Sequence, residues 1–322
     1  MRDFYPMEDR DFNKPRLYIG ASDVATIAGK NRFKTRLQLY NDLIKAKNGE
    51  LSDFRGNNAT KFGSELEPYV VARWLESIDE PRKAQQFMMS RLNEAARFDM
   101  DDMSLHSFQE IRHADHDYLV AHPDIIATGD TPFLLEAKVT SPYNKRGIDN
   151  PHEGYVPKDG NGTDIPLSVF LQVQFQLHLM GLENAQVIAI IGYDFHKYEI
   201  EYSAAVVERV MSMCVNFWQL VQDETPPEAM NLEDLNDLYP EPEPKKVYQA
   251  ADKDMKYLKM FKVASDSIKA SEIMKKTASF EIKKAMEDCQ VMEYAGQPVC
   301  KLMGKSNYVK VTKEGIEAID EN

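Results

Sequence analysis

Apolar residues recur at the 3.6-residue spacing of amphipathic helices in several segments of the chain. The first of these helices is predicted to be capped by Ser22, and the second to end at Gly49. The third is predicted to begin at Ser64, with Glu67 at the third helical position as in a capping box. The predicted helices cover residues 22–29, 35–49, 61–77, 168–181 and 203–222.

Runs rich in β-branched and apolar residues predict strands between these helices. The first two runs, 117–127 and 133–140, are joined by the turn-forming residues TGDTP and predict a β-hairpin. Two further strands are predicted at 185–192 and 197–202, after a long loop over 141–166 that is rich in Pro, Gly and Asn. The order of elements predicts an α/β fold, a mixed central sheet flanked by helices.

The composition changes at TPPEAMNLEDLNDLYPEPEPKK, where five prolines stand among polar and acidic residues. We therefore expect a domain over residues 1–224, a Pro-rich acidic linker over 225–247 and a C-terminal module over 248–322. In that module, residues 248–288 predict one long helix or a helical pair. Short strands that turn at AGQP and GKSN are expected to follow.

The distribution of charge changes this picture. The formal net charge is -13, which argues against binding nucleic acid over the whole surface. Residues 10–49, however, hold nine Lys or Arg against three Asp or Glu, and residues 245–284 hold eleven against five. Such stretches can line a channel for DNA in an acidic protein. The alternative, that they are solvated helix faces, remains open.

The sequence has no pattern that predicts a membrane span, a leader peptide, a disulfide framework or a zinc site. No apolar run reaches the length of about 18 residues that a membrane span needs, and the N-terminus has no apolar leader, so we expect a cytoplasmic protein without membrane contact. The three cysteines, Cys214, Cys289 and Cys300, lie far apart and do not have the spacing of a disulfide framework or a zinc site.

One acid-x-Lys triplet differs from the other three in the chain. Glu136 and Lys138 lie in a predicted strand, where a spacing of two places both side chains on one face. If the hairpin turn is centred on Asp130, Asp124 lies opposite Glu136. Two facing carboxylates repel unless a cation lies between them, and oxygen ligands suit Mg²⁺ or Mn²⁺. A solvated edge-strand pattern is the alternative that this geometry leaves open.

Five motifs together resemble a known family. In chain order they are IGASDVATIAG, FGSELEP, HPD ending at Asp124, LLEAK with Glu136 and Lys138, and LQVQFQ with Gln172. Over about residues 16–200 the chain resembles the lambda-exonuclease-like viral recombinases, also called the YqaJ type. The resemblance implies a PD-(D/E)XK nuclease core.

The resemblance also implies roles for individual residues. Asp124, Glu136 and the main-chain carbonyl of Ala137 would ligate Mg²⁺, for which Mn²⁺ can substitute. Lys138 would position the attacking water, Gln172 would support the water or the lysine, and Glu67 would add an acidic group. Glu67 could instead be only a capping residue, and Gln172 only a surface residue on a polar helix strip.

For DNA contacts, the resemblance implies that Arg16 and Ser22 receive a 5′ phosphate. A helix N-terminus favours such an anion, although Ser22 could equally be an ordinary N-cap. Lys30, Arg32 and Arg36 belong to the adjacent basic run and are expected to contact DNA.

The activity so implied is metal-dependent exonucleolytic hydrolysis from double-stranded DNA ends, in the 5′ to 3′ direction, for phage-type recombination in a bacterial host cell. The chain lacks a P-loop sequence, which fits hydrolysis without ATP. Expected partners are a single-strand annealing protein and further copies of the chain in a ring. A structure-specific or restriction-like endonuclease and a non-catalytic DNA-binding adaptor are the alternatives.

Overall fold

The structure is a computed structural model that describes residues 5–6, 14–51, 58–89, 97–107, 109–140, 155–156 and 165–320. The chain divides into two compact units, Met1–Glu241 and Pro242–Asn322. Each unit is described by itself below. No helix among the described residues is both long and apolar enough to cross a membrane.

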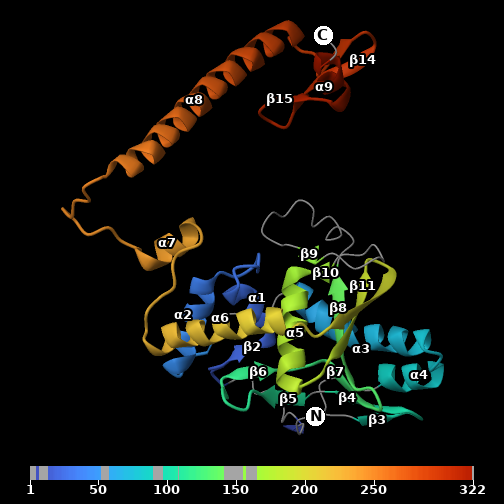
Figure 1. Ribbon diagram of the computed structural model, residues 1–322. Helices are drawn as coiled ribbons and strands as arrows, with labels where there is room; N and C mark the ends of the chain where they lie inside the picture. The colour runs from blue at the N-terminus through green and yellow to red at the C-terminus, as the bar shows by residue number, and fades with distance from the viewer. Residues whose placement is uncertain are drawn as a thin grey trace. The chain divides into compact units, whose positions relative to one another are not determined.

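A six-stranded sheet lies at the centre of the first unit (Figure 1). β11 pairs with β8 in parallel and every other neighbouring pair is antiparallel, so the sheet is mixed, as predicted. In spatial order its strands are β12 (Asp194–Glu201), β11 (Asn184–Ile191), β8 (Phe133–Thr140), β7 (Ile125–Gly129), β4 (Met103–Ser107) and β3 (Arg97–Asp99).

Helices cover both faces of this sheet, because successive strand residues point to opposite sides. Ile126 and Leu134 belong to one hydrophobic core together with residues of several helices, whereas Ile125 and Leu135 belong to a second core. The flanked α/β architecture predicted from the sequence is confirmed. Helices of the first core are α1 (Val24–Ile27), α2 (Arg36–Lys47), α5 (Leu167–Met180) and α6 (Ala204–Gln222); those of the second are α3 (Asn58–Ser77) and α4 (Pro81–Met89).

The hairpin of β7 and β8 has the register that the sequence predicted. Ile125 pairs with Leu135 and Ala127 pairs with Phe133, as a turn centred on Asp130 requires. The predicted strand over 117–127, however, is two strands.

The first part of that segment, β6 (Leu119–Ala121), belongs to another sheet, of order β1-β5-β6-β2. The break falls at His122–Asp124 and contains Pro123, which has no N–H to give to a strand ladder. Asp124 therefore lies directly before β7. The other strands outside the central sheet of this unit are β1 (Tyr5–Pro6), β2 (Ile19–Gly20) and β5 (Gln109–Arg112), with β9 (Tyr155–Val156) paired to β10 (Ile165–Pro166).

Two predicted helix starts are wrong. α3 begins at Asn58, so Ser64 does not cap it and Glu67 lies in its interior. A Ser-x-x-Glu spacing looks the same inside a helix, so this local signal does not mark where α3 begins. Near the N-terminus, Ser22 lies inside a short 3₁₀ helix, η1 (Ala21–Asp23), and the Asp23 carboxylate accepts the Gly20 N–H at 2.9 Å.

The expected linker over 225–247 contains a helix, α7 (Leu232–Leu238). Its Asp234 is fully buried and accepts hydrogen bonds from the Thr35 hydroxyl, at 2.7 Å, and from the Met230 N–H, at 2.8 Å. These bonds attach α7 to the first unit, and the division between units falls after it, at Glu241.

The second unit consists of one long helix followed by a small antiparallel sheet and a terminal helix. The sheet turns between β13 and β14 at Ala295 and Gly296, both with positive φ, which is typical of a tight hairpin. The single long helix decides between the two forms that the sequence left open, and α9 was not predicted. The elements are α8 (Asp252–Met286), β13 (Val291–Tyr294), β14 (Gln297–Met303), β15 (Tyr308–Val311) and α9 (Lys313–Asp320).

Candidate active site

Asp124, directly before β7, and Glu136, within β8, lie side by side. The main-chain N–H of Ala137 donates to Asp124 Oδ2 at 2.7 Å, which holds the carboxylate against β8. Glu136 is 1% exposed. Burial, and next the charge of Glu136, raise the pKa of Asp124 well above its usual value. The two carboxylates are therefore close and partly shielded from water, as the hairpin register predicted.

Glu136 receives hydrogen bonds at both of its carboxylate oxygens. Lys138 Nζ donates to Oε1 at 2.5 Å, and Gln172 Nε2 donates to the same oxygen at 2.5 Å. Gln176 Nε2 donates to Oε2 at 3.0 Å. Gln172 and Gln176 can act on one group because residues four apart lie on the same face of α5. This polar strip thus faces the carboxylates and not solvent.

Glu67 comes to the same site from α3. Burial raises its pKa, the ammonium of Lys138 lowers it, and the charge of Glu136 raises it. The net shift is upward. The charges of Lys138 and Glu136 act on the Glu67 carboxyl, so Glu67 lies near this site, although among the described residues it does not form a three-residue metal cluster with Asp124 and Glu136.

The ammonium of Lys138 is strongly held in its charged form. Burial alone would lower the pKa of Lys138, but the carboxylates of Glu136 and Asp124 outweigh burial and raise the pKa above its usual value. Lys138 therefore keeps its positive charge at neutral pH. Its side chain is 32% exposed.

The donor set suits a hard cation. Mg²⁺ in proteins takes one or two carboxylates and fills its other positions with water or phosphate oxygens. Asp124 and Glu136 supply two carboxylates whose mutual repulsion a cation would relieve. Across the described part of the chain, no three His, Cys, Asp or Glu side chains converge closely enough to hold a metal ion. A cation here would therefore depend on these two side chains, main-chain oxygen and water.

The predicted DNA-contacting residues lie in the N-terminal part of the first unit. Arg16 forms an ion pair with the buried carboxylate of Asp23, and its guanidinium lies 4.7 Å from the ring centre of Tyr18. Ser22 is exposed. The three cations of the basic run, Lys30, Arg32 and Arg36, are also exposed.

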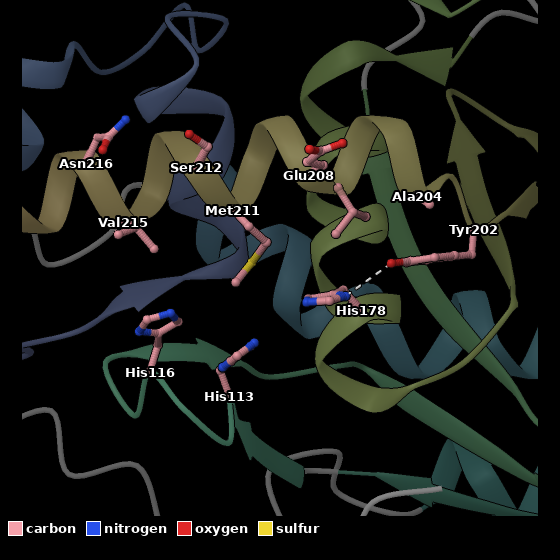
Figure 2. Close-up of a pocket in the computed structure, with 11 residues that line it drawn as sticks. His113, His116, His178, Tyr202, Ala204, Glu208, Met211, Ser212, Val215 and Asn216 are labelled. Carbon is pink, nitrogen blue, oxygen red and sulfur yellow. Dashed lines mark hydrogen bonds between the residues drawn. The ribbon is translucent and has the colours of Figure 1, made fainter.

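A separate pocket of about 450 Å³ lies between α6, the end of α5 and the β5–β6 connection (Figure 2). Three histidines line it, and the rings of His113 and His178 are 5.6 Å apart. Tyr202 bonds to His178 Nδ1 at 3.2 Å. His178 is two residues beyond Gln176, so it points to a different side of α5. No sequence signal identified this pocket, because His113 and His178 are far apart in the chain.

The chain matches the family model of the YqaJ-like viral recombinase domain over residues 12–183. This match covers more than half of the 322 residues, and the chain belongs to that family. A curated relative is YqaJ of Bacillus subtilis strain 168, described as an uncharacterized protein. It is 25% identical over 205 residues, which are 62% of this chain and 52% of that protein. The chain thus spans about half the length of this relative.

Solved structures similar to this one include two exonucleases. The alkaline exonuclease LHK-Exo of Laribacter hongkongensis gives a TM-score of 0.44 at 19% identity, covering 65% of this chain and 91% of that one. A phage-related exonuclease of Haemophilus somnus 129PT gives 0.41 at 12% identity, covering 65% and 97%.

Proposed function

We propose that the protein is a metal-dependent DNA exonuclease that hydrolyses phosphodiester bonds from double-stranded ends, in the 5′ to 3′ direction. The observation that supports this most is the buried Glu136, held at both oxygens beside Asp124 and Lys138. Membership of a viral recombinase family supports the same proposal. Mg²⁺ is the proposed ion, with Mn²⁺ able to replace it.

The roles of the residues follow from their contacts. A bound Mg²⁺ supplies a water of lowered pKa and neutralises charge on the phosphodiester. Asp124, Glu136 and the Ala137 carbonyl would hold the ion. Lys138, fixed in its charged form, orients the water and faces the charge that develops on phosphate. Gln172 limits rotation of the Glu136 carboxylate.

Substrate contacts are proposed for the N-terminal segment. Lys30, Arg32 and Arg36 are exposed, and we propose that they contact phosphates. Arg16 and Ser22 are proposed to receive the 5′ phosphate, with Arg16 oriented by Asp23. Salt weakens such contacts, so a preference for 5′-phosphorylated ends is expected to diminish as salt rises. We further propose a single-strand annealing protein as partner and a ring of identical subunits.

Nuclease activity on labelled DNA tests the proposal. Linear duplexes labelled at either the 5′ or the 3′ end, and covalently closed circles, are incubated with Mg²⁺, Mn²⁺, Ca²⁺ or excess chelator. We expect mononucleotide release from linear DNA with Mg²⁺ or Mn²⁺ and none with chelator or Ca²⁺, because Ca²⁺ takes looser coordination. Equal degradation of circles and linear DNA would instead indicate an endonuclease. Full activity in chelator would rule out the metal.

Substitution of the three central residues tests the site itself. Asp124→Ala, Glu136→Ala and Lys138→Ala are each expected to lower the rate at least about 100-fold, because each acts on the ion, the water or the phosphate. Glu281 and Lys283 of α8 form the same acid-x-Lys triplet outside the site, so Glu281→Ala and Lys283→Ala are matched controls. Control variants as inactive as the site variants would contradict the assignment.

Melting of the metal-free protein gives an independent test. Asp124→Asn removes the carboxyl that lies next to the buried Glu136, while keeping an oxygen that can accept the Ala137 N–H. In excess chelator we expect this variant to be more stable than wild type by on the order of 1 kcal/mol. A less stable variant would show that the carboxylates do not repel each other.

A further inference from the structure

The two polar atoms of the Gln176 side chain differ, because the amide nitrogen has a hydrogen-bond partner and the amide oxygen has none among the described residues. The side chain is 0% exposed, and its Nε2 donates to Glu136 Oε2 at 3.0 Å. Its Oε1 is buried and has no hydrogen-bond partner among the described residues. Buried polar atoms in folded proteins are nearly always paired, so an unpaired acceptor beside a catalytic carboxylate calls for an explanation.

Turning the amide around does not remove the problem. The flipped amide would place Oε1 against the Glu136 carboxylate, where two acceptors face each other without a proton. The carboxylate therefore fixes the orientation with Nε2 toward Glu136. Oε1 is left as an acceptor that needs a donor.

Gln174, on the same helix, is a buried glutamine whose two polar atoms both have hydrogen-bond partners. It is also 0% exposed, but its Nε2 donates to the Glu201 carbonyl at 2.7 Å and its Oε1 accepts the Ser203 N–H at 2.7 Å. Both ends of the Gln174 amide thus join α5 to the segment that runs from the last residue of β12 to the residue before α6. Gln174 is a structural residue, and Gln176 differs from it by the one acceptor left open.

We propose that Gln176 is a positioning residue of the nuclease site, which fixes Glu136 through Nε2 and accepts a hydrogen bond at Oε1 from a water molecule held there. The inference rests on the proposed function and deepens it. Gln172 donates to the other oxygen of Glu136, so the two glutamines hold the carboxylate from both sides. Gln176 in addition orders water next to the carboxylate.

The test compares Gln176→Met with Gln174→Met in the full chain. Methionine fills similar space without donor or acceptor, so both variants lose polar contacts and not volume. For Gln176→Met we expect kcat to fall and the Mn²⁺ concentration at half-maximal binding to rise, each about tenfold, as for other residues that orient a metal ligand. KM for DNA stays unchanged. Gln174→Met keeps wild-type kcat and Mn²⁺ affinity.

Mn²⁺ affinity is measured without DNA, from the rise in melting temperature as Mn²⁺ is added. Melting in chelator adds a readout that separates positioning from a structural role. Gln174→Met is expected to melt at a lower temperature than Gln176→Met. The first variant leaves two main-chain groups unpaired, whereas the second leaves one carboxylate oxygen of Glu136 without one of its donors. A lower melting temperature for Gln176→Met, with kcat and Mn²⁺ affinity unchanged, would overturn the inference.

A third variant, Gln176→Glu, keeps an acceptor oxygen but sets a carboxylate against Glu136. We expect it not to restore kcat, because the donor that fixes Glu136 is lost. Restoration to the wild-type kcat would overturn the role of Nε2. If the wild-type protein does not degrade DNA, the proposed function fails. The Mn²⁺ titration still decides the inference on Gln176, which an unchanged midpoint in Gln176→Met refutes.

Discussion

The helices α5 and α8 differ most in how their side chains meet the rest of the protein. α5 has 14 residues, eight of them buried, whereas α8 has 35 residues and buries only Met286. The apolar residues of α5 pack in a core, but Phe261 and Phe280 of α8 are 75% and 63% exposed within their own unit. Packing therefore fixes the side chains of α5, while α8 depends on local helical interactions.

This difference in packing explains why polar residues form specific hydrogen bonds in α5 and solvent-exposed ion pairs in α8. In α5 the buried Gln174 and Gln176 hold defined partners because their backbone cannot shift away. In α8 the Lys and Asp side chains face water, where ion pairs contribute little. Specific polar contacts thus need the rigid frame that apolar packing supplies.

The largest expected effect is on stability, from truncating one phenylalanine in each helix. Phe175 is fully buried, so Phe175→Ala should destabilise the first unit by about 3–5 kcal/mol. Phe280→Ala should change stability by no more than about 0.5 kcal/mol, because its side chain already lies in water. Residue-resolved hydrogen exchange measures each unit separately. Similar losses for both would mean that α8 is covered in solution.

The hairpin was the element best predicted from sequence, for a physical reason. The two β-branched runs on either side of TGDTP favour a single turn centre, at Asp130. That centre determines which residues of β7 and β8 lie opposite each other. Because Glu136 and Lys138 share a face of β8, the approach of Lys138 to Glu136 followed from the same pattern. Local turn chemistry and strand periodicity were sufficient here.

Other features depend on long-range packing that no local pattern records. The short strands β3 and β4 alternate polar and apolar residues over only three and five positions, and β5 has a single apolar residue, Ile111, so none of the three can be distinguished from a loop. The attachment of α7 through Asp234 depends on Thr35, which is distant in sequence. The open acceptor of Gln176 likewise emerges only when α5 meets Glu136.

A smaller effect is expected at the C-terminal ends of the two helices. α5 ends at Gly181 with φ +67°, and nothing lies within 4 Å of a Cβ placed there. Gly181→Ala should therefore cost about 1 kcal/mol from backbone strain alone. α8 ends at Glu287, which also has positive φ, of 48°. Glu287→Gly should raise the stability of the second unit by about 0.5 kcal/mol. Thermal melting that shows the opposite signs would refute this account of the helix ends.

The smallest expected effect concerns the exposed ion pair of α8 between Lys262 and Asp266, whose charged atoms lie 2.5 Å apart. Their side chains are 77% and 57% exposed, so water and salt screen the attraction. The lysine also precedes the acid by four residues, the weaker of the two orientations in a helix. Lys262→Ala should therefore change the stability of α8 by less than about 0.5 kcal/mol, and alanine's higher helix propensity offsets part of that loss.

Hydrogen exchange of the α8 amides at low and high salt measures the effect, with Lys269→Ala as a control in the same helix. A loss well above that of the control, present at both salt concentrations, would show that the pair is shielded from water and that α8 resembles α5 more than its exposed side chains indicate.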